Sequence, residues 1–280
     1  MRINKYVKSA TVAEAHRLLK SETNAALVGG GAYLRLSKRR IGCAVDLFEA
    51  GLDYVRKNGK GLELGAMATF RQIETDPLTL ESNDGLLARA VGCVVGVQLR
   101  NLSTVGGSVG GKYGFSNLIT ALLALDAEVV LHKTGAIGLA DYLQRKRNRL
   151  DLVTAVVVPR RDQRASFQII QKTHADYGLL NVAVVRPRKS TGDIRIAVGA
   201  RPGVAKLASK AMAYLETVLG DKTTRGRSVK ARAARANAAE EAARLAASEL
   251  AFGDDVRASA WYRRQVCSVL VQRALEEVLA

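Results

Sequence analysis

Two glycine-rich stretches, residues 28–32 and 104–111, carry the residue types best suited to binding a ligand in this sequence. Each stretch follows an apolar or β-prone run. Glycine lets the main chain adopt positive φ and brings bare N–H groups close to an anion, so consecutive glycines after a strand can form a site for phosphate oxygens. Thr104 and Ser108 add hydroxyls to the second stretch. We therefore expect two backbone loops that close on one phosphate-bearing ligand; the alternative is tight turns that only fold the chain.

Two common phosphate-binding motifs fit these stretches poorly. Residues 106–112 match the first seven positions of the pattern GxxxxGK(S/T), but Tyr113 occupies the position of the small hydroxyl that holds Mg²⁺, and Gly114 interrupts the helix that should follow. Neither stretch satisfies GxGxxG with an acidic residue at the expected distance, so a Rossmann dinucleotide fold is not supported.

Composition limits the class of protein. The chain has 280 residues, long enough for two or three compact units, and 48% of them are hydrophobic. No apolar signal segment opens the sequence, which predicts a cytoplasmic protein with no membrane span. The net charge is +17, but the basic clusters are scattered and lack interleaved aromatic residues, so nucleic acid is not the expected partner. Cys43, Cys93 and Cys267 are too far apart in the sequence for a metal or cluster motif.

The elements around the glycine stretches predict an α/β portion that ends near residue 165. Amphipathic spacing predicts a helix over 11–20, followed by a strand over 25–28 that enters the first stretch. A strand-like run over 97–103 precedes the second stretch. Further elements are expected as strands over 44–47, 62–65 and 127–131 and as helices over 69–76, 84–95 and 116–125.

The remainder of the chain predicts a smaller α+β unit. Strand-like runs in close succession suggest one antiparallel sheet, over 152–158, 165–173, 180–185 and 194–198. Helices are expected over 204–219, 231–250 and 257–279. Trp261 and Tyr262 are expected to anchor the last helix in the core.

Several motifs, taken in order, point to one family. Residues 98–108 read Gln-Leu-Arg-Asn-Leu-Ser-Thr-Val-Gly-Gly-Ser, and Ser116-Asn117-Leu118 follows them. The other matching segments are 26–31, 64–69, 122–131 and 167–183, the last carrying Lys172. Together they closely resemble the FAD-binding medium subunit of molybdenum hydroxylases, the family of xanthine dehydrogenase and carbon monoxide dehydrogenase flavoproteins. The resemblance covers nearly the whole chain.

The resemblance implies an α+β fold with two parts. Two α/β subdomains would form a PCMH-type, vanillyl-alcohol-oxidase-like FAD-binding unit over 1–165, divided into about 1–58 and 59–165. A C-terminal antiparallel sheet with helices would form a flavoprotein domain over 166–280. The cofactor-binding residues that it implies are Val28, Gly29, Gly30, Gly31, Ala32, Tyr33, Leu34, Thr104, Gly106, Gly107, Ser108, Ser116, Asn117 and Lys172.

The resemblance also implies roles for these residues. Backbone amides of 29–32 would bind the FAD pyrophosphate, together with the amides of Gly106 and Gly107 and the side chains of Thr104 and Ser108. Ser116 and Asn117 would hold ribityl or ribose hydroxyls. Lys172 would lie at the flavin carbonyl edge, where a cation favours reduced, anionic flavin.

This sequence departs from the family pattern at several positions. Gly31 and Ala32 replace the usual hydroxyl and polar pair, Ser108 replaces Asn, Gly114 replaces a common Pro, and Asn117 replaces Asp. Each neutral hydrogen bond lost costs about 1 kcal/mol. These departures predict weaker FAD binding than in the family at large, or in the extreme a subunit that has lost FAD.

The function implied is an oxidoreductase subunit that relays electrons. A molybdopterin-binding large subunit would oxidise the substrate, with a purine as first guess, and a [2Fe-2S] small subunit would pass electrons to FAD, which would reduce NAD or another acceptor. The chain needs no catalytic acid, base or metal ligand of its own, because the cofactor carries the redox chemistry.

Two alternatives remain open from the sequence. A UDP-N-acetylmuramate reductase-like flavoenzyme also carries a Val-Gly-Gly segment in its second loop, although counterparts of its catalytic serine and glutamate are not evident here. A basic, flavin-free scaffold or nucleic-acid-binding protein would instead show strongly salt-dependent binding to DNA or RNA.

Overall fold

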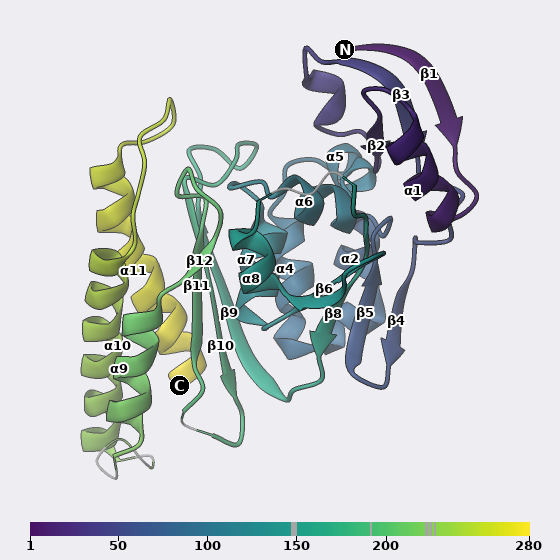
Figure 1. The fold of residues 1–280 in the computed structure, drawn as a ribbon. Helices are drawn as coiled ribbons and strands as arrows, with labels where there is room; N and C mark the ends of the chain where they lie inside the picture. Colours follow the sequence, from purple (N-terminus) through teal and green to yellow (C-terminus); the bar gives the residue numbers. More distant parts are fainter. Residues whose placement is uncertain (147–149, 191, 222–223, 225, 227) are drawn as a thin grey trace.

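The computed structural model describes residues 1–280 apart from 147–149, 191, 222, 223, 225 and 227. Its described residues form three sheets, with helices packed between and beside them (Figure 1). The chain passes from a small N-terminal lobe, through a middle lobe, to a C-terminal sheet covered by long helices. The fold is therefore α+β, as the sequence predicts.

The N-terminal lobe is built on a parallel sheet in the order β1-β3-β2. Its elements are β1 (Arg2–Lys8), α1 (Val12–Ser21), β2 (Ala26–Val28), the 3₁₀ turn η1 (Leu34–Leu36) and β3 (Arg40–Asp46). Thr11 caps α1 by accepting a hydrogen bond from the Glu14 amide, which explains where the helix begins. Strand β1 was not expected, because its polar residues are mostly exposed at the sheet edge.

The middle lobe contains an antiparallel sheet in the order β4-β5-β8-β6-β7. Its strands are β4 (Val55–Asn58), β5 (Gly61–Gly65), β6 (Glu128–Leu131), β7 (Gly135–Gly138) and β8 (Val153–Pro159). The expectation that 152–158 belongs to the C-terminal sheet is wrong. Strand β8 lies between β5 and β6, where its run of valines is buried on both faces.

Short helices surround this sheet and bring the sequence motifs together (Figure 1). They are α2 (Phe70–Thr75), α3 (Pro77–Glu81), the 3₁₀ turn η2 (Asn83–Gly85), α4 (Leu86–Gly92), α5 (Val97–Leu102), α6 (Val105–Gly111), α7 (Asn117–Ala124) and α8 (Leu139–Gln144). Two expectations are wrong here: the run 97–103 is helical rather than a strand, and the second glycine-rich stretch is helix α6 rather than a loop. A short apolar run does not distinguish helix from strand, and tertiary contacts override the low helix propensity of glycine.

The C-terminal unit is an antiparallel sheet in the order β12-β11-β10-β9, faced by α9, α10 and α11. Its elements are β9 (Gln163–Ile170), β10 (Leu180–Pro187), β11 (Arg195–Gly199), β12 (Lys206–Leu207), α9 (Ser209–Leu219), α10 (Val229–Glu249) and α11 (Ala260–Leu279). Val182 and Val184 of β10 pack in the core beneath these helices, whereas Ala183 and Val185 pack in the core of the middle lobe. This alternation buries both faces of β10 and joins the C-terminal unit to the rest of the chain.

The start of α11 differs from the expectation. Trp261 is 69% exposed and Tyr262 is 37% exposed, so neither anchors the helix in the core. Buried Arg263 holds this end instead, donating to the carbonyls of Leu179, Gly253 and Ala258 and pairing with Asp255. No helix among the described residues is long and apolar enough to cross a membrane.

Candidate functional site

The first glycine-rich stretch is an open loop that leaves β2 and leads into η1. Gly30 and Gly31 have φ values of +72° and +71°, a conformation that strongly favours glycine. None of the amides of residues 29–32 donates a hydrogen bond to an acceptor within the described part of the chain. Four successive backbone donors are therefore available to an anion at this turn.

Helix α6 packs directly against this loop. The Thr104 hydroxyl donates to the Gly29 carbonyl at 3.1 Å and accepts from the Gly107 amide at 3.1 Å, so one side chain caps the helix and ties it to the loop. A Cβ on Gly30 would lie 1.8 Å from the Leu102 carbonyl oxygen, and one on Gly107 would lie 2.9 Å from the Thr104 hydroxyl. These glycines permit a close backbone approach.

The amides at the start of α6 are already engaged. The Gly106 amide donates to the Ala66 carbonyl at 2.7 Å, and the Gly107 amide donates to the Thr104 hydroxyl. A Cβ on Gly106 would lie 2.8 Å from the Ala66 Cβ, so this glycine lets the helix sit on the end of β5. Both amides, which the sequence analysis expects to bind phosphate, thus already donate to acceptors within the chain.

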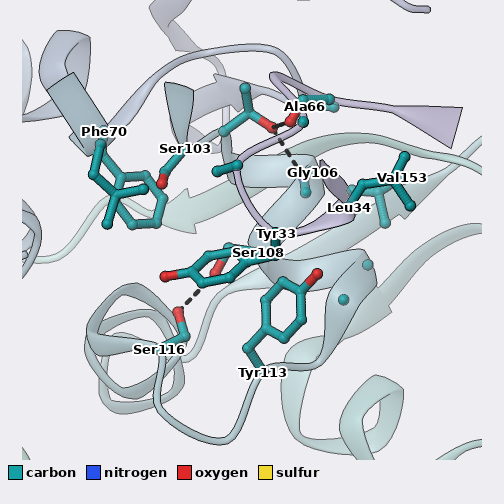
Figure 2. A pocket seen from close by; sticks show the side chains of 18 of the residues that line it. Tyr33, Leu34, Ala66, Phe70, Ser103, Gly106, Ser108, Tyr113, Ser116 and Val153 are labelled. Carbon is teal, nitrogen blue, oxygen red and sulfur yellow. Dashed lines mark hydrogen bonds between the residues drawn. The ribbon is translucent and has the colours of Figure 1, made fainter. Parts of the chain in front are cut away.

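The next polar side chains along the chain, Ser108 and Ser116, are hydrogen-bonded to each other. The Ser108 and Ser116 hydroxyls lie 2.6 Å apart, as the dashed line in Figure 2 marks. Ser116 also caps α7 by accepting from the Ile119 amide. Both serines line the cleft described below, and a ligand hydroxyl there would compete with their mutual hydrogen bond.

Asn117 belongs to a buried network that joins α7 to β10. Its side-chain nitrogen donates to the Ala90 carbonyl at 3.2 Å, and its oxygen accepts from Asn181 at 2.7 Å. Asn181 in turn accepts from Thr120 at 2.8 Å. The network has no room for larger neighbours, since a Cβ on Gly199 would lie 2.0 Å from the Thr120 hydroxyl. Asn117 therefore fixes the position of the C-terminal sheet relative to the cleft.

Aromatic rings from three separate segments form one wall. Tyr33 lies 4.9 Å from Tyr113 and 5.1 Å from Phe115, and Tyr113 stacks on Phe115 at 5.2 Å, measured between ring centroids. Tyr177 meets Phe115 edge-on at 4.9 Å, and the Arg257 guanidinium lies 4.9 Å from the Tyr177 centroid. Burial first, and then contact with Tyr177, raise the pKa of Tyr33 above its ordinary value, so its hydroxyl remains a donor. Figure 2 shows the Tyr33 and Tyr113 rings beside the Ser108–Ser116 pair.

These features surround a cleft of about 290 Å³ where the N-terminal, middle and C-terminal parts of the chain meet. The expected site residues that line it are Gly29, Gly31, Ala32, Tyr33, Leu34, Thr104, Gly106, Gly107, Ser108, Ser116 and Asn117. Three expected residues are not among its lining: Val28 lies at the end of β2, Gly30 is exposed at the loop tip, and Lys172 is exposed just after β9.

Sequence reasoning missed part of the lining. Arg39, Phe115, Asp176 and Tyr177 all border the cleft. Arg39 carried a signal, since it lies in a basic run shortly after the first loop. Tyr177 had none, because the pairing of β9 with β10 alone decides that the segment between them reaches the cleft.

Lys112, the lysine of the partial GxxxxGK match, binds elsewhere. Its amine donates to the carbonyls of Tyr142 and Arg145 at 2.5 and 2.6 Å and lies 4.4 Å from the Tyr142 ring centroid. It is the C-cap of α6 with φ +46°. The structure therefore gives no support to a P-loop here.

The lobes meet at a cleft with an aromatic wall and with glycine amides that have no acceptor among the described residues, an arrangement suited to a phosphate-bearing aromatic cofactor. Residues 1–161 match the family described as FAD binding domain in molybdopterin dehydrogenase. Residues 165–278 match the family described as CO dehydrogenase flavoprotein C-terminal domain. The chain belongs to the FAD-binding subunits of molybdenum hydroxylases, which is an oxidoreductase family, and the resemblance seen in the sequence is confirmed.

Relatives in this family align over almost their full length. The chain is 25% identical to the glyceraldehyde dehydrogenase medium chain of Sulfolobus acidocaldarius, covering 98% of this chain and 97% of the relative. It is 26% identical to the nicotine 6-hydroxylase medium subunit of Paenarthrobacter nicotinovorans, covering 98% and 96%. A chain of carbon monoxide dehydrogenase from Hydrogenophaga pseudoflava has the same fold, with a TM-score of 0.86 at 21% identity over 99% of this chain and 97% of that one.

The cleft fits the FAD that the family implies. A dinucleotide pyrophosphate needs several donors, and the amides of residues 29–32 lack acceptors among the described residues. A flavin ring needs aromatic and apolar contacts, which the rings of Tyr33, Tyr113, Phe115 and Tyr177 provide. The site therefore agrees with FAD as the cofactor and gives no support to the flavin-free scaffold.

Proposed function

We propose that this chain is the electron-relay subunit of a three-subunit molybdenum hydroxylase. In this assembly it takes electrons from iron–sulfur clusters of a small subunit and delivers them to NAD or another soluble acceptor, while a molybdopterin-binding large subunit oxidises the substrate. The observation that carries the proposal is the row of amides at residues 29–32 that have no acceptor among the described residues, beside the cleft of a chain in this family.

The first loop is proposed to bind the pyrophosphate. Its amides supply donors without any side-chain rearrangement, and the exposed Arg39 at the cleft adds a positive charge. Because the amides of Gly106 and Gly107 donate within the fold, helix α6 supports this loop through Thr104 rather than sharing the phosphate contacts. Ser108 and Ser116 remain candidates for the ribityl or ribose hydroxyls.

The aromatic wall is proposed to position the ring system and to limit its contact with water. Bound FAD supplies the redox chemistry, since its ring system accepts electrons singly and gives them up as a hydride. The chain itself needs only to bind, orient and shield the cofactor. Tyr177 is held at the border between the C-terminal unit and the cleft, because Arg257 lies over its ring and pairs with the neighbouring Asp176.

Two measurements test this proposal in sequence. The purified chain, saturated with FAD and desalted, is expected to show flavin absorption bands and to release FAD on denaturation. The complex with its two partner subunits is then expected to bleach these bands when the oxidisable substrate is added, and NAD is expected to restore them.

Three outcomes differ in meaning. Absence of flavin even in the purified complex would overturn the cofactor assignment. Bleaching by substrate without recovery on adding NAD would keep the relay and replace NAD by another acceptor. Bands that substrate does not bleach in the intact complex would overturn the relay itself.

A further inference from the structure

Two arginines lie opposite each other on neighbouring strands of the C-terminal sheet, far from the cleft. Arg164 of β9 and Arg186 of β10 are directly opposite in the antiparallel register. Like charges at opposite positions of neighbouring strands repel and destabilise the sheet. Arg186 continues the face of β10 on which Val182 and Val184 contact the helices, so both guanidinium groups lie on the helix side.

A third arginine comes from the helix layer. Arg235 of α10 donates from one nitrogen to the carbonyl oxygens of Thr224 and Gly226, at 3.0 and 2.8 Å. These two bonds orient its guanidinium group, and its other donors bond to no acceptor in the described part of the chain. Burial first, and then the charges of Arg164, Arg235 and Arg188, lower the pKa of Arg186, which indicates that these charges lie close together.

None of the three arginines has a counter-charge among the residues that the structure describes. Arg164, Arg186 and Arg235 form no ion pair with any carboxylate in the part of the chain that the structure describes. The Nε of Arg186 is buried and has no hydrogen-bond acceptor there. Arg188 differs, since Asp84 and Asp162 both pair with it.

The carboxylate that faces β9 from the helices is engaged elsewhere. Glu277 of α11 accepts hydrogen bonds from Ser166 and Gln168, on the same face of the strand. The carboxylate of Glu277 is therefore hydrogen-bonded by neutral side chains, and the arginines pair with no carboxylate among the described residues. A fold that gained nothing from these charges would be more stable with a neutral residue at either strand position.

We propose that Arg164, Arg186 and Arg235 form a binding site for a multiply charged phosphate anion, either inorganic pyrophosphate or the diphosphate of a nucleotide. Guanidinium groups bind phosphate oxygens through paired, charge-assisted hydrogen bonds. A pyrophosphate group carries enough charge to balance all three and accepts at several oxygens, whereas one carboxylate balances only one.

This site is separate from the cofactor cleft. Gly178 lines the cleft near the start of β10, and Arg186 lies eight residues further along the chain. At about 3.3 Å per residue the two ends are roughly 25 Å apart. The end of β10 and the first turn of α10 both lie in the lower part of Figure 1, away from the N-terminal lobe. The proposal does not depend on the electron-relay function.

Isothermal titration of the full chain tests the proposal. The chain is first saturated with FAD and desalted, which fills the cofactor's own phosphate site and leaves no free FAD to compete at the arginines. Constant ionic strength removes the general effect of a basic surface. Pyrophosphate and ADP are titrated separately, into the unmodified chain and into Arg186→Gln, Arg164→Gln and Arg17→Gln. Arg17, exposed on α1, provides a control with the same change in charge.

We expect saturable binding by the unmodified chain and by Arg17→Gln. Arg186→Gln and Arg164→Gln should each weaken it by about tenfold or more, since a hydrogen bond to a charged group is lost. Tighter binding of ADP than of pyrophosphate would identify a nucleotide as the ligand, and equal binding would identify the phosphate group alone.

A second readout separates binding from folding. Without ligand, Arg164→Gln should melt at a higher temperature than the unmodified chain at low salt, because it removes the cross-strand repulsion. Pyrophosphate should raise the melting temperature of the unmodified chain more than that of this variant. Absence of saturable binding, or the same affinity in Arg164→Gln as in Arg17→Gln, would overturn the site even if Arg186→Gln failed to fold.

Discussion

The two glycine-rich stretches look alike in sequence but differ in backbone structure and in what their amides bond to. The first is a loop whose amides at residues 29–32 lack acceptors among the described residues, while the second is helix α6, whose first amides donate within the fold. Glycine is needed in the first for positive φ and in the second for close contact with Ala66 and Gly29.

This difference teaches that a glycine-rich motif does not by itself identify the atoms that bind phosphate. Thr104 connects the two stretches, because its hydroxyl contacts Gly29 and caps α6 at the same time. The motif around Thr104 therefore holds the loop of residues 29–32 in place. In the function proposed above, the phosphate contacts come from the loop.

The largest expected effect comes from Gly30→Ala. Its Cβ would lie 1.8 Å from the Leu102 carbonyl oxygen, and φ is +72°. We expect a loss of about 3 kcal/mol or more in the free energy of unfolding, measured by urea denaturation. Gly31→Ala is the matched control, because it has φ +71° and only a distant contact with Val28. It should lose only about 1–2 kcal/mol. Equal losses would mean that Gly30 does not lie against the Leu102 carbonyl as described.

Thr104→Val should have a smaller effect that reaches both stretches. It removes the hydrogen bond to Gly29 and the cap on Gly107, and should cost about 1–2 kcal/mol of unfolding free energy. It should also weaken FAD binding, measured by fluorescence titration, because the donor loop loses its support. Thr104→Ser keeps the hydroxyl and should retain most of the stability and most of the FAD affinity. A valine variant with unchanged FAD affinity would show that the loop is held without α6.

Gly110→Ala should change stability in the other direction. Gly110 lies inside α6, and an added Cβ would contact only Val153 at 3.8 Å, an ordinary van der Waals distance. Replacing a helical glycine by alanine should raise the unfolding free energy by about 0.5–1 kcal/mol. Gly106→Ala, in the same helix, should lower it because of the contact with Ala66. Destabilisation by Gly110→Ala would argue that this stretch is not helical in solution.

Lys172→Met should have the smallest effect. Lys172 is exposed and does not line the cleft, and exposed charges are strongly screened. We expect the dissociation constant of FAD to change by less than about twofold. A loss of about tenfold would show that Lys172 reaches the bound flavin, as the family resemblance implies.

Much of this molecule could be predicted from local sequence signals. The helices expected over 11–20, 69–76 and 116–125 are present. In the structure Thr11, Thr69 and Ser116 cap them, because a side-chain oxygen before an apolar periodic run satisfies the first free amides. The order of the motifs identified the family and the cofactor. The partition of strands between sheets could not be predicted, since β8 differs from its neighbours only in its partners.

The sequence by itself determined the α+β class, the helices with strong caps and periodicity, and membership of the FAD-binding family, because each depends on residue types at short range. The tertiary structure alone decided which glycine amides have no acceptor among the described residues, that Asn117 is hydrogen-bonded to Asn181, and that Arg164 opposes Arg186. Each of these depends on strand register and on contacts between residues far apart in the chain, which no local pattern encodes.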